Sequence, residues 1–224
     1  MKHPLRKIVD HRDETTLAAS LRRRRFRLFL SLVTPLPKPV TILDLGGEQR
    51  FWEVMGLVAN DDYQIVILNV YPLEIEHHNL RSVVGDATDL HDYADQEFDF
   101  AFSNSVIEHL GSYERQQHMA NEVQRVSKHY FVQTPNRYFP LEPHFLVPFF
   151  QFFPLSLQIS LMQRFNLGWY KKIPGKEEAL QQLRSHRLLT EQEMRALFPQ
   201  GGLYRERILG LTKSFIAYGS GRSI

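Results

Sequence analysis

The stretch TILDLGGEQRFWEVMG, Thr41 to Gly56, decides the fold of this chain. Five residues typical of a buried strand lead into two adjacent glycines, Gly46 and Gly47, and a helical pattern follows at once. Glycine leaves backbone N–H groups uncovered, and the start of a helix receives polar or anionic ligand groups. The turn therefore predicts a nucleotide-like ligand. The third glycine of a dinucleotide fingerprint is missing, so these residues alone do not identify that ligand.

Strand-like and helix-like segments alternate after this turn. We expect strands at 41–45, 64–70, 81–87, 98–105 and 129–135, and helices at 48–58 and 112–127. Such alternation predicts a parallel sheet that is covered on both faces. Near the end, a helix at 189–199 with Thr190 as its N-cap precedes two strands joined by a short turn at Gly210, and so tight a link requires an antiparallel pair.

The composition is that of an ordinary globular protein with a net charge of only +2 and no cysteine. The missing cysteines exclude disulfides, thiolate nucleophiles and cysteine-ligated zinc or iron–sulfur sites. The small net charge makes a nucleic-acid partner an unfavoured interpretation, with one local arginine run as its only support. The first residues are charged and lack the apolar core of a signal peptide, which favours a cytoplasmic location.

Residues 1–40 form a basic N-terminal helical extension, since residues 1–30 hold nine Lys or Arg against three Asp or Glu. The segment Leu21–Val33 reads as a helix in which cationic and apolar residues interleave, and the following prolines end it. Two interpretations stay open. The helix lies on an anionic membrane surface or on phosphate, giving peripheral membrane contact, or it covers the sheet edge and exposes a solvated basic face.

The remaining residues, 41–224, are expected to form one domain with an insertion at about 137–187. Within it, Pro143–Gln163 has no Asp, Glu, Lys or Arg, and twelve of the 18 residues from Phe145 to Met162 are apolar. That length approaches a membrane span, but the prolines, glutamines and serines argue against one. A lid over the substrate end of the sheet is the favoured interpretation, with a segment touching lipid as the alternative.

Ligands of an open parallel sheet bind at the carboxyl ends of the strands, where the strand order reverses. The segments that follow these ends are therefore the candidates for a site: Asp44–Glu48, Asn69, Gly85–Ala87, Ser103–His109 and Thr134–Asn136.

Taken together, the motifs ILDLGG, ILNVYP, VVGDATDL and FDFAFSNSVIEHL resemble those of the class I S-adenosylmethionine-dependent methyltransferases. The resemblance implies an α/β fold, with a Rossmann-like, seven-stranded, mostly parallel sheet, an antiparallel terminal strand and helices on both faces, to which the aromatic-rich lid insertion is added. It implies S-adenosyl-L-methionine as cofactor. The aromatic, apolar composition of the lid separately suggests a small-molecule or lipid-linked acceptor that is partly hydrophobic. The residues implied in cofactor binding are Asp44, Gly46, Gly47, Asn69, Asp86, Ala87, Ser103, Asn104 and Ser105.

Two positions depart from the family pattern. Glu48 or Gln49 stands where the family commonly has another glycine, and an acid there favours a cationic or zwitterionic ligand over a pyrophosphate. Asn69 stands where the family has an acid that accepts hydrogen bonds from both ribose hydroxyls, whereas an amide offers one acceptor oxygen and a donor group.

His109 and His144 are the candidate catalytic residues, because an imidazole is the side chain best suited to general-base chemistry near neutral pH. No metal site is expected, since the adjacent His77 and His78 would point in different directions on a helix.

The sequence thus predicts a methyltransferase. A non-catalytic methyltransferase-like module for binding or assembly is the main alternative, and an NAD or nucleotide-sugar enzyme is a weaker one because GxGxxG is absent.

Overall fold

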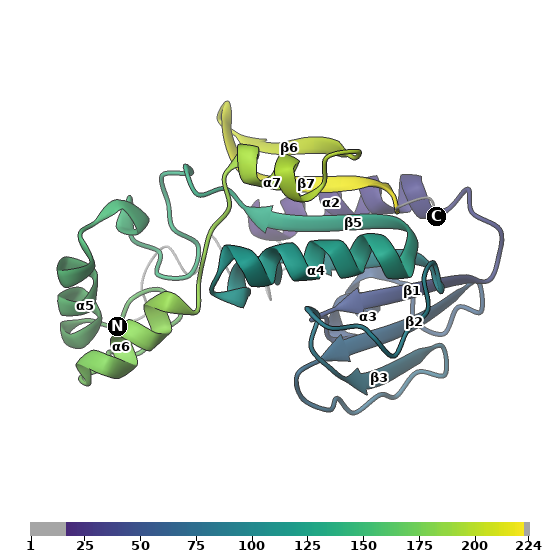
Figure 1. The fold of residues 1–224 in the computed structure, drawn as a ribbon, viewed down its shortest axis with the longest axis horizontal. Coiled ribbons are helices and arrows are strands. Elements are labelled where there is room, and N and C mark those ends of the chain that lie inside the picture. Colours follow the sequence, from purple (N-terminus) through teal and green to yellow (C-terminus); the bar gives the residue numbers. More distant parts are fainter. Residues whose placement is uncertain (1–16, 222–224) are drawn as a thin grey trace.

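The computed structural model describes residues 17–221 (Figure 1). The expectation for residues 1–16, as the first part of the basic extension, lies outside this range. The architecture is a seven-stranded sheet in the order β3-β2-β1-β4-β5-β7-β6. Its strands are β1 (Val40–Leu45), β2 (Tyr63–Asn69), β3 (Leu80–Val84), β4 (Phe98–Asn104), β5 (Ser127–Pro135), β6 (Gly202–Ile208) and β7 (Leu211–Ser220).

The first five strands are parallel, and β7 runs antiparallel to both of its neighbours. The chain fills the sheet outward from β1 through β2 to β3, then returns to the other side of β1 as β4. The strand order therefore reverses between β1 and β4, and ligands of such sheets bind at the carboxyl ends flanking this point. The predicted fold class, including the antiparallel C-terminal strand, is confirmed.

Helix α2 (Leu17–Val33) covers one face of the sheet and runs behind it in Figure 1. Phe26, Phe29 and Val33 are buried against branched and aromatic residues of the strands. The Phe29 ring lies at the centre of an aromatic cluster, with its centroid 4.9 Å from that of Phe102 and 6.0 Å from that of Trp52. Trp52 belongs to α3 (Gln49–Met55), which packs on the same face. The helix thus lies over the face of the sheet, not over its edge as the sequence suggests.

The opposite face is covered by α4 (Tyr113–Val126) and α7 (Glu191–Leu197). Both helices begin with the caps expected from the sequence. The Ser112 hydroxyl accepts from the N–H of Arg115, and Thr190 forms a capping box with Glu193. Because both sheet faces are covered, the central strands β1 and β4 are buried along almost their whole length rather than on alternate residues, as parallel strands in such folds are.

The insertion after β5 forms a small unit with an apolar core of its own, located beyond the carboxyl end of β5 in Figure 1. It contains the 3-10 turn η2 (Phe150–Phe152) and the helices α5 (Leu155–Arg164) and α6 (Lys176–Arg184). Phe145, Phe150, Ile159 and Met162 are buried in its core. Among the described residues, no helix has the length and apolarity that crossing a membrane requires.

Candidate functional site

The glycine turn closes the carboxyl end of β1. Gly46 has φ +73°, a left-handed conformation, and its N–H donates to the carbonyl oxygen of Leu68 at 2.7 Å. A Cβ on Gly46 would lie 2.6 Å from Cγ2 of Val106, and a Cβ on Gly47 would lie 1.7 Å from Oδ2 of Asp44. The turn thus requires glycine at both positions, for backbone conformation and close approach at Gly46 and for close approach alone at Gly47.

Asp44 is buried beneath the turn, with 1% of its surface exposed. The indole Nε1–H of Trp52 donates to its Oδ2 at 2.6 Å. Burial raises the pKa of Asp44 to about 7, and the hydrogen bond from Trp52 opposes that rise only in part. Asp44 is therefore held under the turn by α3 and titrates near neutral pH.

Asn69, at the end of β2, is bonded on both sides of its amide. Its Nδ2 donates to the carbonyl oxygen of Gly47 at 3.1 Å, and its Oδ1 accepts from the N–H of Val70 at 2.8 Å. An aspartate could not make the first of these bonds, because an ionised carboxylate has no hydrogen to donate. The amide thus ties the end of β2 to the glycine turn.

Asp86 and Ala87 follow β3 in a tight loop. Oδ1 of Asp86 accepts from the N–H and the hydroxyl of Thr88, both at 2.8 Å, and Oδ2 pairs with Nη2 of Arg115 at 2.9 Å. Partial burial opposes the ionised form, but these donors outweigh it and lower the pKa of Asp86. Asp86 therefore carries its negative charge at neutral pH, while Ala87 is buried.

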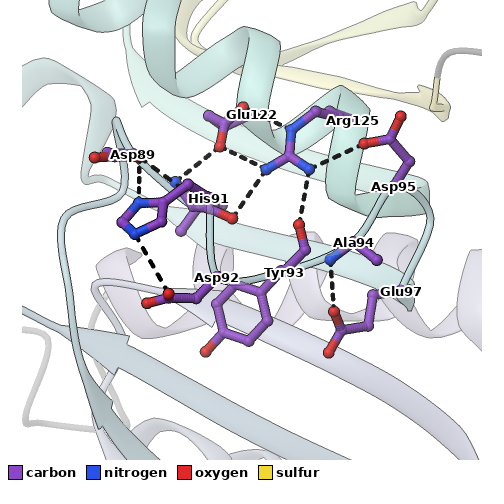
Figure 2. A network of polar contacts seen from close by, with 10 residues as sticks. Asp89, His91, Asp92, Tyr93, Ala94, Asp95, Glu97, Glu122 and Arg125 are labelled. Carbon is purple, nitrogen blue, oxygen red and sulfur yellow. Dashed lines mark hydrogen bonds and ion pairs between the residues drawn. The ribbon is translucent and has the colours of Figure 1, made fainter.

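The loop that continues from Asp86 is fastened to α4 by Arg125 (Figure 2). Its guanidinium pairs with both carboxylate oxygens of Glu122 at 2.8 Å and with Oδ1 of Asp95 at 3.0 Å. It also donates to the carbonyl oxygens of Leu90 and Tyr93. A single, partly exposed arginine thus holds the loop of residues 90–95, which follows Asp86, against α4.

The end of β4 is bonded within the protein as well. The Ser103 hydroxyl points to the carbonyl oxygen of Leu45 at 3.4 Å, and Oδ1 of Asn104 accepts from Nη1 of Arg25 at 2.7 Å. Ser105 has φ +62°, and its hydroxyl donates to Oε1 of Gln133 at 2.8 Å. Arg25 comes from α2, so the basic helix reaches into the candidate site.

Two hollows lie near these strand ends. A cavity of about 10 Å³, room for roughly one water, is lined by Arg22, Arg25, Phe26, Phe51, Phe102, Asn104 and Phe131. A more open hollow of about 230 Å³ is lined by Asn136, Tyr138, Thr190, Glu191, Gln192, Thr212 and Phe215. The first lies between α2, α3 and the sheet, and the second lies at the carboxyl end of β5.

His109 and His144 lie together, and the structure adds His186, which the sequence analysis missed. The ring centroids are 4.9 Å apart for His109 and His144, 4.7 Å for His109 and His186, and 4.4 Å for His144 and His186. His109 is on the 3-10 turn η1 (Ile107–Leu110), His144 is in the insertion, and His186 follows α6. No local spacing in the sequence connects the three.

The three imidazoles have different pKa values. Desolvation by the side chains packed around its ring, together with the neighbouring His144, lowers the pKa of His109 to about 3 even though the residue as a whole is exposed, and burial lowers the pKa of His186. Burial opposes the charged form of His144 too, but its hydrogen bond to Glu142 outweighs this and raises the pKa. Beside them, burial raises the pKa of Glu108, whose Oε2 accepts from the Thr134 hydroxyl at 3.0 Å.

Comparisons with known proteins agree with this architecture. Residues 49–130 match a family model described as a methyltransferase domain, and no curated protein matches the chain. At 11–16% identity, the likeness to solved structures concerns the fold alone.

A SAM-dependent methyltransferase from Methanosarcina mazei has a TM-score of 0.54 and 13% identity, with 85% of this chain and 96% of that chain covered. The 1,6-didemethyltoxoflavin-N1-methyltransferase of Burkholderia thailandensis, solved with that compound and S-adenosylhomocysteine, has a TM-score of 0.54 and 11% identity, with 98% and 85% covered. A possible exported protein from Bordetella parapertussis has a TM-score of 0.56 and 16% identity, with 89% and 68% covered. The fold that the resemblance to class I methyltransferases implies is thereby confirmed, while the roles of individual site residues stay predictions.

Proposed function

We propose that this chain, which has the fold of class I methyltransferases, transfers a methyl group from S-adenosyl-L-methionine to a partly hydrophobic small-molecule or lipid-linked acceptor. The observation that carries the proposal is the glycine turn at the point where the strand order reverses. Gly46 and Gly47 leave no side chain between the end of β1 and a ligand above it, and Asp44 lies fixed beneath. These residues fit the amino-acid end of a cationic cofactor, since Asp44, Glu48 and Asp86 place acidic groups at this edge.

The chemistry asks little of the protein beyond position. The cofactor supplies a methyl group on a sulfonium, and this chain must hold the acceptor atom in line with it and exclude water. The bonds of Asn69, Asn104 and Asp86 fix the strand ends before any ligand arrives, so the site is organised in advance. The histidine cluster lies at the insertion side, where an acceptor would enter.

The hydrophobic character of the acceptor is inferred from the insertion. Phe149 and Phe165 are more than half exposed, at 53% and 55%, although the insertion has an apolar core that could bury them. The Tyr138 and Phe152 rings are exposed and stacked with centroids 6.1 Å apart. Exposed aromatic groups that gather on one segment mark a surface for apolar ligands or lipid.

A methyl-transfer assay with labelled cofactor tests the proposal against acceptors of graded hydrophobicity. We expect transfer to acceptors that carry an acyl or isoprenoid chain, and at least tenfold lower kcat/KM with their short hydrophilic counterparts. Equal use of small hydrophilic acceptors contradicts the acceptor class, and no transfer to any acceptor by a protein that binds the cofactor leaves the activity unsupported.

A non-catalytic binding or assembly module is the second candidate, and the bonding of Asn69 favours it. Both the NH₂ group and the oxygen of the Asn69 amide are hydrogen-bonded within the protein, and the residue has no carboxylate to accept hydrogen bonds from the ribose hydroxyls. The substitution Asn69→Asp separates the two. A module gains cofactor binding only in the variant, whereas the methyltransferase proposal requires that the natural chain binds it already.

The basic helix supports peripheral membrane contact as a further part of the proposal. Arg23, Arg24 and Arg27 are exposed on α2, whereas Arg25 turns inward to Glu206 at 3.2 Å. An exposed cationic helix is attracted to anionic headgroups with an energy that salt screens. Sedimentation with phosphatidylserine vesicles should show binding that 0.5 M salt removes. Binding that is equal on neutral vesicles contradicts the role of the helix.

A further inference from the structure

We propose that His109, His144 and His186 form a binding site for one divalent transition-metal ion, with Zn²⁺ as the best match. Each histidine offers one ring nitrogen, and these three atoms all lie within 4.8 Å of one another. Within the described part of the chain, these three histidines are the group of His, Asp or Glu side chains that lie close enough together to hold a metal ion. The proposal replaces the expectation of no metal, which rested on His77 and His78.

The rings are oriented as metal-binding histidines are. Nδ1 of His144 lies 2.7 Å from Oε1 of Glu142, and Nδ1 of His186 lies 3.0 Å from the carbonyl oxygen of Gln182. A histidine ligand typically donates its second N–H to a carboxylate or a backbone carbonyl, which fixes the ring and leaves the other nitrogen as the ligand. In both residues, Nε2 is then the nitrogen available to a metal.

Glu142 is itself held firmly, so its effect on His144 is well defined. It is buried, and its Oε2 accepts from the N–H groups of His144 and Phe145 at 2.7 and 2.6 Å. A buried carboxylate behind one ligand supplies negative charge that a cation offsets. Glu142 thus fixes the orientation of the His144 ring and also supplies the negative charge that favours a bound cation.

Only a small rearrangement separates the present geometry from coordination. Ligand nitrogens around a tetrahedral Zn²⁺ at about 2.0–2.1 Å lie roughly 3.4 Å apart, so nitrogens that now lie within 4.8 Å of one another must approach by up to about 1.4 Å. His109 sits on a single 3-10 turn and His186 follows the end of α6, so side-chain rotation can supply this movement. The Tyr170 hydroxyl, now 2.8 Å from Nε2 of His186, would yield that position to the metal.

Three histidines leave one coordination position open. Zinc sites of this kind hold a water or a substrate oxygen there and lower its pKa. At the insertion side of the sheet, the ion would polarise an acceptor hydroxyl, a role that the sequence analysis gave to His109 or His144 acting as a base. Metal binding itself is measured without methyl transfer, so it can fail or hold independently of the proposed function.

The test uses the tag-free full chain, stripped with EDTA, dialysed, and titrated with ZnCl₂ by calorimetry. We expect one Zn²⁺ per chain, at least 100-fold weaker binding in His109→Gln, His144→Gln and His186→Gln, and an intermediate loss of 10- to 100-fold in Glu142→Gln. Tyr170→Phe should retain binding, because the hydroxyl only occupies the position of the metal. His78→Gln is the matched control and should bind as the natural chain does.

Visible spectra of the Co²⁺-loaded chain give a second readout that does not depend on the variants folding equally. Intense bands of a four- or five-coordinate ion support the site, and the weak spectrum of hydrated Co²⁺ overturns it. The proposal is also overturned if the natural chain binds no Zn²⁺ at 100 μM, or if His109→Gln and His144→Gln bind as well as the natural chain.

Discussion

The glycine turn and the histidine cluster lie at the same edge of the sheet, yet their polar groups are satisfied differently. At the turn, Asp44, Asn69 and Asn104 are bonded to Trp52, Gly47 and Arg25, all within the protein. In the cluster, three imidazoles from distant segments face one another; Glu142 holds one side of the His144 ring, and His186 is bonded to Gln182 on one side and to the Tyr170 hydroxyl on the other. The polar groups of the turn are all used to hold the protein together, whereas the cluster presents imidazole nitrogens that can bind a ligand. Substitutions at the turn should therefore change stability, and substitutions in the cluster should cost binding.

The largest loss of stability is expected from Arg25→Met. Arg25 joins α2 to the buried Glu206 and to Asn104, and its removal leaves Glu206 with the Ser214 hydroxyl at 2.7 Å and the more distant Lys213. Because Lys213 then compensates the buried charge of Glu206 only in part, we expect a loss near the lower end of the about 3–5 kcal/mol that breaking a buried ion pair costs. Urea unfolding measures the change, with the exposed Arg27→Met as control. If the two substitutions lower the unfolding free energy equally, Arg25 does not anchor α2 to the sheet.

Asp44→Asn should remove a pH dependence of stability. The pKa of Asp44 is about 7 in the folded chain and near 3.8 when unfolded, so ionisation favours the unfolded state as pH rises between those values. The variant should gain stability over the natural chain from pH 4 to 7, by up to about 4 kcal/mol, and the difference should stay constant above pH 7. Unfolding in urea at pH 5, 6, 7 and 8 measures it. A difference that does not vary with pH contradicts a titrating Asp44.

Arg125→Gln should have a smaller effect, about 1–2 kcal/mol, because the guanidinium is partly exposed but holds the loop after β3 through several bonds. The exposed pair of Arg115 with Asp86 supplies the matched comparison, and Arg115→Gln should cost less than about 1 kcal/mol. Thermal melts of both variants rank the two contacts. The reverse order would mean that the loop is held elsewhere.

His109→Gln should change unfolding free energy least, by under about 0.5 kcal/mol, since the residue is exposed at the end of a short turn. The same variant should lose at least tenfold in methyl transfer if the cluster faces the acceptor. Melting and activity are measured on one preparation, beside His78→Gln. A destabilisation of several kcal/mol with unchanged activity would mean that the cluster stabilises the fold, as the turn does, and takes no part in methyl transfer.

The sequence was sufficient for the parts that depend on local pattern. The strand β1 with its glycine turn, the Ser112 and Thr190 caps and the tight hairpin at Gly210 are each decided by neighbouring residues, and the structure confirms them. The inward turn of Arg25 and the joining of His186 to His109 and His144 depend on segments far apart in the chain. No periodicity or spacing carries that information, because it arises only when the sheet brings the segments together.

Calorimetric titration of the natural chain with S-adenosyl-L-methionine tests the central claim most directly. Gly47→Ala serves as the disabling variant, because its Cβ would displace the Asp44 carboxylate, and Gly210→Ala serves as control, because its left-handed turn has nothing within 4 Å of the added atom. The account predicts one cofactor per chain, binding weakened at least 100-fold in Gly47→Ala and retained in Gly210→Ala. No heat of binding at millimolar cofactor, or equal binding by Gly47→Ala, would contradict it.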